Sequence, residues 1–194
     1  MRSLLLLLLG CKGGPTAEEC LTCTCTEEAQ PSFGANHVTD PVDYADPPPT
    51  SGPHNPCWLE PGVYTEEPPD ERWVHTMEHG AVVYLYNCPD GCADEVAQLE
   101  ALHQEDTQRT LVAPYSLMTS RFAAVAWQNR LLADCLEAER FRQFHNEHVD
   151  NAPESTTAPP PEGCHDADDT GATDDTGGGD DSGGGDSGGG DSAR

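Results

Sequence analysis

The chain has 194 residues, enough for one domain of ordinary size with tails. Its 35 acidic residues against 9 basic ones give a formal net charge of -26, which would repel phosphate backbones and excludes nucleic acid as an expected partner. Attraction of cations is the natural counterpart of this charge, and the apolar residues, concentrated between about positions 38 and 149, can bury one modest core.

Residues 1–11 have the pattern of an export signal. Arg2 supplies a positive charge, six leucines follow, and Leu8-Leu9-Gly10-Cys11 resembles a bacterial lipobox, in which the cysteine carries the lipid. A generic secretory signal is the alternative, because ten residues before the cysteine is short. With Cys11 lipidated, the membrane becomes a partner through the lipid anchor. The protein would then lie in the bacterial cell envelope, at the outer membrane or the periplasmic face.

The remaining cysteines form an even set, which in an exported protein predicts up to four disulfides. They are Cys20, Cys23, Cys25, Cys57, Cys88, Cys92, Cys135 and Cys164. Their spacing alone does not give the pairing. As an alternative, Cys20-Leu-Thr-Cys-Thr-Cys25 could hold a soft metal such as Cu(I) through thiolates. Residues 12–36 are polar and lack apolar periodicity, so we interpret them as a tether attached by disulfides.

Residues 37–70 are rich in proline and glycine. Pro47-Pro48-Pro49 favours an extended path, and Ser51-Gly52-Pro53 favours a turn. Trp58 and Tyr64 supply apolar anchors, so we expect an ordered segment that wraps around the rest of the domain.

Regular structure is expected from residue 81 onward. Residues 81–86 form a continuous apolar run typical of a strand covered on both faces, and 93–105 have helical periodicity. Strands are predicted at 110–115, 122–127 and 130–135, and a closing helix at 136–149. This order predicts a single small α+β domain over residues 37–154, with a mixed sheet of about four strands and two helices. Thioredoxin-like and ferredoxin-like layers both fit.

The end of the chain has no capacity for a core. Residues 155–194 are proline- and threonine-rich at first and then repeat Asp, Gly and Ser, which offers too little apolar surface to offset chain entropy. We therefore predict a disordered acidic tail.

The densest group of coordinating side chains is His75-Thr-Met-Glu-His79, with His54 about twenty residues earlier. In a helix or in a strand, the spacing of four places the two rings of His75 and His79 on one face. Imidazole is a common donor to transition metals, so a copper or zinc site is predicted at His54, His75, His79 and Glu78. Met77 would add a thioether in a strand, whereas a helix would turn it aside.

Two other interpretations of this segment remain open. His75-Thr-Met-Glu-His79 matches H-x-x-E-H, the pattern of a small zinc-dependent hydrolase in which Glu78 would activate water. Gly80 and a strand follow at once, whereas those peptidases keep the motif inside a long helix. Alternatively, the histidines only bond loop carbonyls within a structural or interaction module. His145 and His148 favour a helix C-terminus, and His37 and His103 carry no independent signal.

Cys88-Pro-Asp-Gly-Cys92 lies between the strand predicted at 81–86 and the helix predicted at 93–105. A redox pair of the thioredoxin type would occupy such a junction, where the helix N-terminus lowers a thiol pKa. The spacing is C-x-x-x-C instead of C-x-x-C, however, and we favour a purely structural disulfide.

Five motifs resemble those of the domain of unknown function 3105 family. They are Pro48-Pro-Thr-Ser-Gly-Pro-His54, Gly62-Val-Tyr64, Glu71-Arg-Trp-Val-His75, Glu78-His-Gly80 and Ala126-Trp127, within a match from about His37 to Glu154. The resemblance implies one domain in an exported or membrane-attached setting, and it singles out His54, His75, Glu78 and His79. It implies no activity. We expect metal binding or delivery rather than catalysis, because no complete nucleophile-and-base set is visible.

Overall fold

The computed structural model describes residues 20–162 and residue 164. The expected signal sequence, the lipidation site at Cys11 and the tail beyond residue 164 lie outside the described residues. Within the part that is described, no helix is long and apolar enough to cross a membrane.

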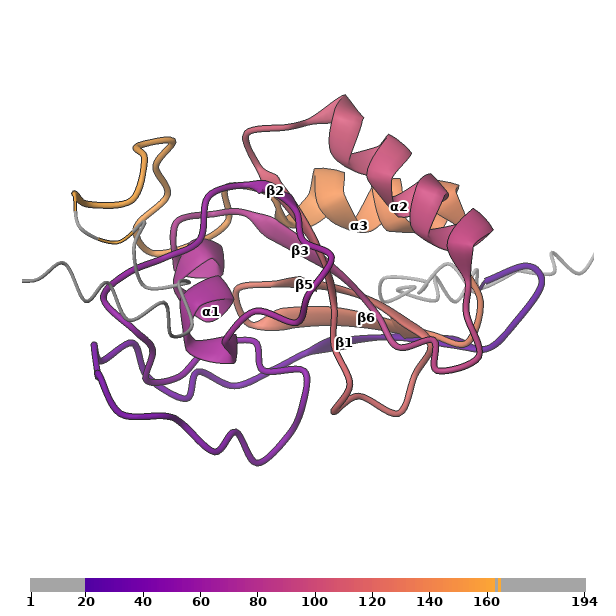
Figure 1. Cartoon of the computed structure of the whole chain (residues 1–194). Helices are drawn as coiled ribbons and strands as arrows, with labels where there is room; N and C mark the ends of the chain where they lie inside the picture. The colour runs from indigo at the N-terminus through magenta and orange to yellow at the C-terminus, as the bar shows by residue number, and fades with distance from the viewer. Residues whose placement is uncertain (1–19, 163, 165–194) are drawn as a thin grey trace, which may run out of the picture.

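A six-stranded mixed sheet forms the centre of the fold, in the order β1-β6-β5-β3-β4-β2 (Figure 1). The strands are β1 (Cys25–Ala29), β2 (Gly62–Val63), β3 (Val82–Tyr86), β4 (Thr110–Pro114), β5 (Phe122–Ala126) and β6 (Asn129–Ala133). β3 and β4 are parallel neighbours connected by α2 (Ala93–Glu105), and β2 adds a short parallel edge to β4. β5, β6 and β1 continue the other side of the sheet in antiparallel fashion.

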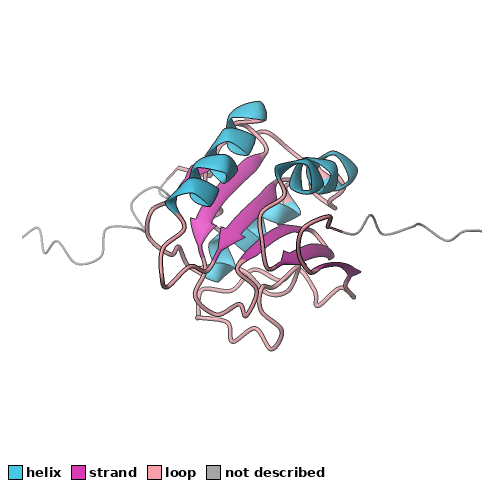
Figure 2. Cartoon of the chain, turned by 90° about the vertical axis from the view of Figure 1, so that its right-hand side faces the viewer, coloured by secondary structure: helices cyan, strands magenta, loops and turns pink. Residues whose placement is uncertain are grey.

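Helices cover both faces of this sheet (Figures 1 and 2). Val82 and Tyr84 of β3 belong to the core beneath α2 and α3 (Ala138–His148), while Val83 and Leu85 pack with α1 (Asp70–Glu78) on the opposite face. Side chains alternate across a strand, so a strand buried on both faces needs apolar residues at every position. This explains the uninterrupted apolar run in β3.

The α+β class is confirmed, but the predicted count of about four strands and two helices is too low. The structure has six strands and three helices in the described residues. β1 arises in the segment interpreted as a tether, and two-residue β2 is too short for periodicity to reveal it. α1 has no solvent-exposed face over residues 72–78, because these are all buried between the sheet and the proline-rich segment.

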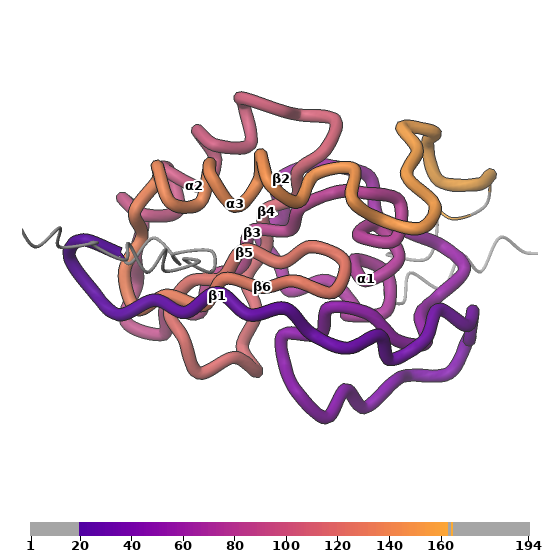
Figure 3. Tube along the Cα trace, turned by 180° about the vertical axis from the view of Figure 1, so that it is seen from behind, coloured from indigo at the N-terminus to yellow at the C-terminus, as the bar shows by residue number. Residues whose placement is uncertain are grey.

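The proline-rich segment does follow an ordered path around α1 (Figure 3, indigo to violet). Tyr44 donates a hydrogen bond from its hydroxyl to Pro53 O at 2.6 Å, and the Pro47–Pro48 peptide is cis. Within this segment, the backbone at residues 36–38 pairs with His54: Val38 N donates to His54 O at 2.8 Å and His54 N donates to Asn36 O at 2.9 Å. These bonds hold His37 beside His54.

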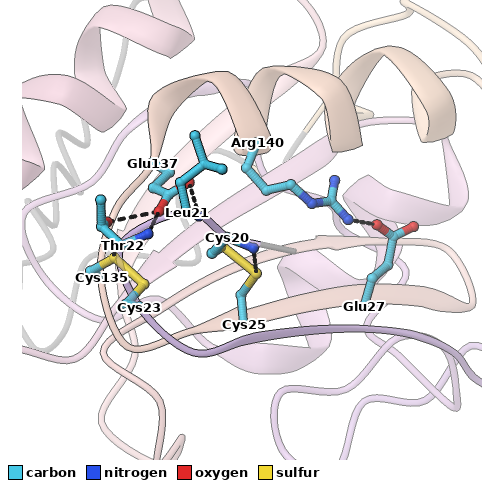
Figure 4. Close-up of a disulfide and its surroundings, with 9 residues drawn as sticks. All are labelled: Cys20, Leu21, Thr22, Cys23, Cys25, Glu27, Cys135, Glu137 and Arg140. Carbon is cyan, nitrogen blue, oxygen red and sulfur yellow. Dashed lines mark hydrogen bonds and ion pairs between the residues drawn. A yellow bond between two sulfur atoms is a disulfide. The ribbon is translucent and has the colours of Figure 1, made fainter. Parts of the chain in front are cut away.

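The eight cysteines of the described residues form four disulfides, as predicted: Cys20–Cys25, Cys23–Cys135, Cys57–Cys164 and Cys88–Cys92. This pairing leaves none of them as a thiolate for the soft-metal alternative. The first two lie together at the start of β1, where Glu137 accepts hydrogen bonds from Leu21 N and Thr22 N (Figure 4). The N-terminal edge strand is thereby fixed to the connection between β6 and α3.

Candidate metal centre

Four side chains bring one possible ligand atom each to within 4.8 Å of one another: His37, His54, His75 and Glu78. His75 and Glu78 are one turn apart on α1, which places both on the same side of the helix. His54 and His37 come from the proline-rich segment, where the isolated bridge between them sets their rings 5.1 Å apart. The centre therefore forms where this segment crosses α1.

Most of this cluster is shielded from solvent. His54, His75 and Glu78 are 0%, 1% and 3% exposed, whereas His37 is exposed. Trp58 packs edge-on against His75 with 4.9 Å between ring centroids, and Trp127 lies 6.2 Å from His54. The site is thus a buried group of donors with one ligand at the surface.

Hydrogen bonds fix how the two buried imidazoles face. Nδ1 of His54 donates to Gly52 O at 2.8 Å, and Nδ1 of His75 donates to Asn55 O at 2.7 Å. Because a carbonyl oxygen only accepts, each Nδ1 carries the proton and each Nε2 keeps its lone pair. Histidines that bind metals through Nε2 are commonly oriented by such a bond from the other ring nitrogen.

The two free nitrogens converge on one carboxyl group. Nε2 of His54 and Nε2 of His75 lie 3.0 and 3.9 Å from Oε2 of Glu78. The His54 contact lacks hydrogen-bond geometry, so this buried Nε2 has no hydrogen-bond partner among the described residues. Either a proton on Glu78 or a cation between these atoms would satisfy them.

Burial dominates the electrostatics of the centre. It lowers the pKa of His54 and lowers that of His75 to about 3, where the neighbouring histidines act in the same direction. Burial, with a smaller contribution from Glu154, raises the pKa of Glu78 to about 7. The protein therefore holds neutral imidazoles, the form that can coordinate a metal.

His79 and Met77 are placed differently from the ligands. His79 follows α1 and donates from Nδ1 to Glu154 O at 2.9 Å; it is not one of the four mutually close ligands, although its ring centroid is 4.6 Å from that of His75. Met77 is fully buried in the core between α1 and the sheet, on the other side of the helix from the cluster. Periodicity could not have found His37, since its position depends on the bridge to His54.

The other histidines lie elsewhere. His103 bonds Thr110 Oγ1 at 2.8 Å, and Nε2 of His145 lies 3.4 Å from Asp106. Nε2 of His148 lies 3.0 Å from Glu27, whose carboxylate also pairs with Arg140. Because the positive charge of Arg140 already pairs with this carboxylate, Glu27 is a poor ligand for a cation.

The segment after α3 holds the end of α1 in place. Glu154 N donates to Glu78 O at 3.2 Å and Thr156 N donates to His79 O at 3.0 Å. These bonds satisfy carbonyls that a helix C-terminus leaves free. A cavity of about 230 Å³ opens beside this segment, lined by Trp58, Thr76, His79, Arg109 and residues 156–160 among others. Cys57–Cys164 closes the same region covalently.

Comparison with known proteins gives one family. No curated protein and no solved structure matches the chain significantly. A family model described as "Protein of unknown function (DUF3105)" matches residues 37–167, a range that includes all four candidate ligands and the elements that carry them. Since this match spans well over half of the chain, the protein belongs to that family, DUF3105.

Proposed function

We propose that this protein binds a transition metal ion, zinc or copper, through His54, His75, Glu78 and His37. One observation carries the proposal: two buried imidazoles are each held by Nδ1 on a backbone carbonyl, and their free Nε2 atoms approach the same carboxyl oxygen. Nitrogen and oxygen donors in this number suit a four-coordinate ion.

The donor set favours Zn²⁺ or Cu²⁺ among the available metals. Imidazole nitrogen suits both ions, whereas Mg²⁺ and Ca²⁺ prefer shells made of oxygen. Cu⁺ prefers sulfur donors, and the nearest candidates do not serve it, because Met77 is buried in the core and the described cysteines are in disulfides.

Binding or delivery fits this centre better than catalysis. Four protein donors would fill a tetrahedral shell, whereas catalytic zinc sites keep one position for water. His37 is the exposed member and can be displaced by an incoming ligand without opening the core. In this proposal the domain is attached by a lipid at Cys11 to the cell envelope, where its disulfides would persist.

Metal titration of the full chain without a histidine tag tests the proposal. We expect the protein to bind one Zn²⁺ or Cu²⁺ per chain in calorimetry, and His75→Ala and His54→Ala to lose that binding. His145→Ala is the matched control, because His145 lies on α3 away from the centre, and it should bind as the parent does. Glu78→Gln keeps the side-chain size and should weaken binding even where an alanine variant folds poorly.

Equal binding by the parent and by His75→Ala, or no binding at all, would contradict the proposal. The second result would favour a structural or interaction module, since the Nδ1 bonds of His54 and His75 also brace the loop at residues 52–55. A hydrolase is the remaining candidate, because a carboxyl pKa of about 7 at Glu78 suits a general base. Casein hydrolysis that is lost in Glu78→Gln while metal is retained would favour it.

For the fold, we infer a thioredoxin-like rather than a ferredoxin-like layer. In a ferredoxin-like sheet another strand separates the two parallel strands of the split β-α-β unit. Here β3 and β4 are direct neighbours, and β5 and β6 continue the sheet on the far side of β3. A solved structure of a family member is the test.

A further inference from the structure

We propose that Cys88–Cys92 is a redox-active pair that exchanges electrons with a dithiol, and that this activity is separate from the metal centre. The disulfide closes the five-residue turn that joins β3 to α2. Cys88 is half-buried, Cys92 is 9% exposed, and the three residues between them are exposed. Cys88 is thus the more exposed residue of the pair and Cys92 belongs to the core, so in this proposal the thiolate approaches the sulfur of Cys88.

The exchange has two steps that balance. A thiolate of the dithiol attacks Sγ of Cys88, the Cys88–Cys92 bond breaks, and Cys92 leaves as a thiolate. The second thiol of the dithiol, once deprotonated, attacks the first sulfur of the same dithiol, which is bonded to Cys88 in the mixed disulfide. This attack releases Cys88 as a thiolate. Both released thiolates take up the protons that the dithiol has lost. The pair has then gained two electrons, and the dithiol has become a disulfide.

The start of α2 supports Cys92 as the leaving group. Cys92 is the N-cap residue of this helix, and its side chain makes no capping hydrogen bond in the disulfide form. The first backbone N–H groups of a helix have no partner within the helix, and they stabilise a thiolate at this position. Asp94 and Glu95 in the first turn oppose this effect, although Arg121 lies 3.5 Å from Glu95 and offsets part of the charge.

Hydrogen bonds, and not only the Cys88–Cys92 disulfide, hold the backbone on both sides of this turn. Asn87 N donates to Arg121 O at 2.8 Å, and its side chain donates to Met118 O at 2.7 Å. Val96 N donates to Cys92 O at 2.9 Å within the first turn of α2. Since these bonds flank the turn on both sides, the pair can open and close while the fold is retained. Cys23–Cys135 and Cys57–Cys164 instead join segments more than a hundred residues apart.

An exposed apolar side chain marks the approach to the turn. Asn87 also donates to Ser116 O at 3.3 Å, so Leu117, which is 63% exposed, lies on a loop attached next to Cys88. A dithiol carried by another protein would find an apolar contact there. The substrate class we infer is accordingly a protein cysteine pair, for which small thiols serve as probes.

Graded reduction of the oxidised full chain by reduced glutathione, followed by alkylation and peptide mapping, tests this proposal. We expect Cys88 and Cys92 to be alkylated at concentrations that leave the other six described cysteines protected. Near-ultraviolet circular dichroism should stay unchanged, and oxidised glutathione should restore the disulfide. Opening of Cys88–Cys92 no earlier than Cys20–Cys25, or only together with loss of the fold, would overturn the proposal.

Single-cysteine variants add a kinetic test with a matched control. Cys92→Ser removes one short-range disulfide and leaves the Cys88 thiol free. Cys25→Ser does the same at the other short-range disulfide and leaves the Cys20 thiol free. We expect Cys88 to react with an aromatic disulfide reagent about tenfold faster than Cys20, because Cys88 lies beside the N-terminus of α2, whose first backbone N–H groups stabilise a thiolate. Equal rates, or a slower Cys88, would assign the turn a structural role only.

Discussion

The two ends of the sheet are held together by different means. At one end of the sheet, adjacent strands carry side by side Tyr86, Phe122, Ala133 and Cys25. Three disulfides lie at this end: one includes Cys25 itself, and the other two include Cys88 and Cys135, each two residues beyond the end of a strand. We call this the cysteine end. At the opposite, histidine end, β3 begins just after α1, and hydrogen bonds from residues 150–156 with one disulfide secure the helix.

The disulfides of one end and the hydrogen bonds of the other leave different side chains able to bind a ligand. Disulfides hold the cysteine end by covalent bonds. The histidine end instead buries imidazoles and a carboxyl group, and it satisfies only one nitrogen of His54. A buried polar atom without a partner costs free energy, so a ligand that completes it stabilises the fold.

The largest expected effect comes from removing one disulfide at each end. Cys57→Ala with Cys164→Ala opens a link across 107 residues, whereas Cys88→Ala with Cys92→Ala opens one across 4. The loop-closure entropy of the unfolded chain predicts losses of about 5 and about 2 kcal/mol in the free energy of unfolding. Urea denaturation measures both. Equal losses would mean that native contacts, not loop length, set the contribution of each disulfide.

A second prediction compares two glycines with similar backbones. Gly80 has φ +93°, and a Cβ there would lie 2.8 Å from Ser155 Oγ and 3.1 Å from Asp150 Cα. Gly91 has φ +88° with nothing within 4 Å of a Cβ. We expect Gly80→Ala to destabilise by about 3 kcal/mol and Gly91→Ala by about 1 kcal/mol, because only the first adds a clash to the unfavourable backbone conformation.

Thermal or urea unfolding of the two alanine variants separates these contributions, with Gly91→Ala as the control for φ alone. A loss at Gly80 no larger than that at Gly91 would show that residues 150–155 move away readily. The histidine end would then be less rigid than its hydrogen bonds indicate.

α1 connects the two ends, and its first residue gives a prediction on pH. Burial raises the pKa of Asp70 to about 6, although its carboxylate accepts a hydrogen bond from the Tyr115 hydroxyl at 2.8 Å. The folded protein therefore keeps a proton that the unfolded chain has released above about pH 4. Between about pH 4 and 6 the native state binds more protons, so its free energy of unfolding falls as the pH rises.

Asp70→Asn should remove this part of the pH dependence, on the order of 2 kcal/mol between about pH 4 and 6. Urea unfolding at several pH values measures it, with exposed Asp90→Asn as the control for the change in net charge. An unchanged slope in Asp70→Asn would show that water reaches this carboxyl group in the folded protein.

The sequence predicted the central elements well because their patterns are local. The expected helix at 93–105 matches α2, and the apolar run at 81–86 contains β3. β1 could not be predicted in this way, since its residues become a strand only by pairing with β6. For α1, sequence reasoning left helix and strand open, because the spacing of four between His75 and His79 places both rings on one face in either conformation.

The same limit applies to the candidate site. Histidine and glutamate side chains within one helical turn are visible in the sequence, and His75 and Glu78 do converge with His54. His37 joins them only through a single backbone bridge, and His79 is drawn to Glu154 O by a segment 75 residues away. Contacts of this range leave no periodic trace in the chain.

The smallest effect, and the sharpest test of the histidine end, is spectroscopic. In the metal-free protein we expect His54 and His75 to be neutral with the proton on Nδ1, and Nδ1 of His79 also to carry a proton, because each of these Nδ1 atoms donates to a backbone carbonyl. Long-range ¹H–¹⁵N spectra report this tautomer, and His145 serves as the reference on α3.

Addition of Zn²⁺ then separates ligands from neighbours. The Nε2 resonances of His54 and His75 should move strongly, while that of His79 should keep its position apart from small ring-current changes, since His79 is not among the four close donors. A proton on Nε2 of His54 or His75 in the free protein would be incompatible with the proposed centre. That Nε2 would then donate a hydrogen bond to Glu78. The polar atoms of the cluster would have partners without an ion, and the histidine end, like the cysteine end, would be held by the protein's own contacts.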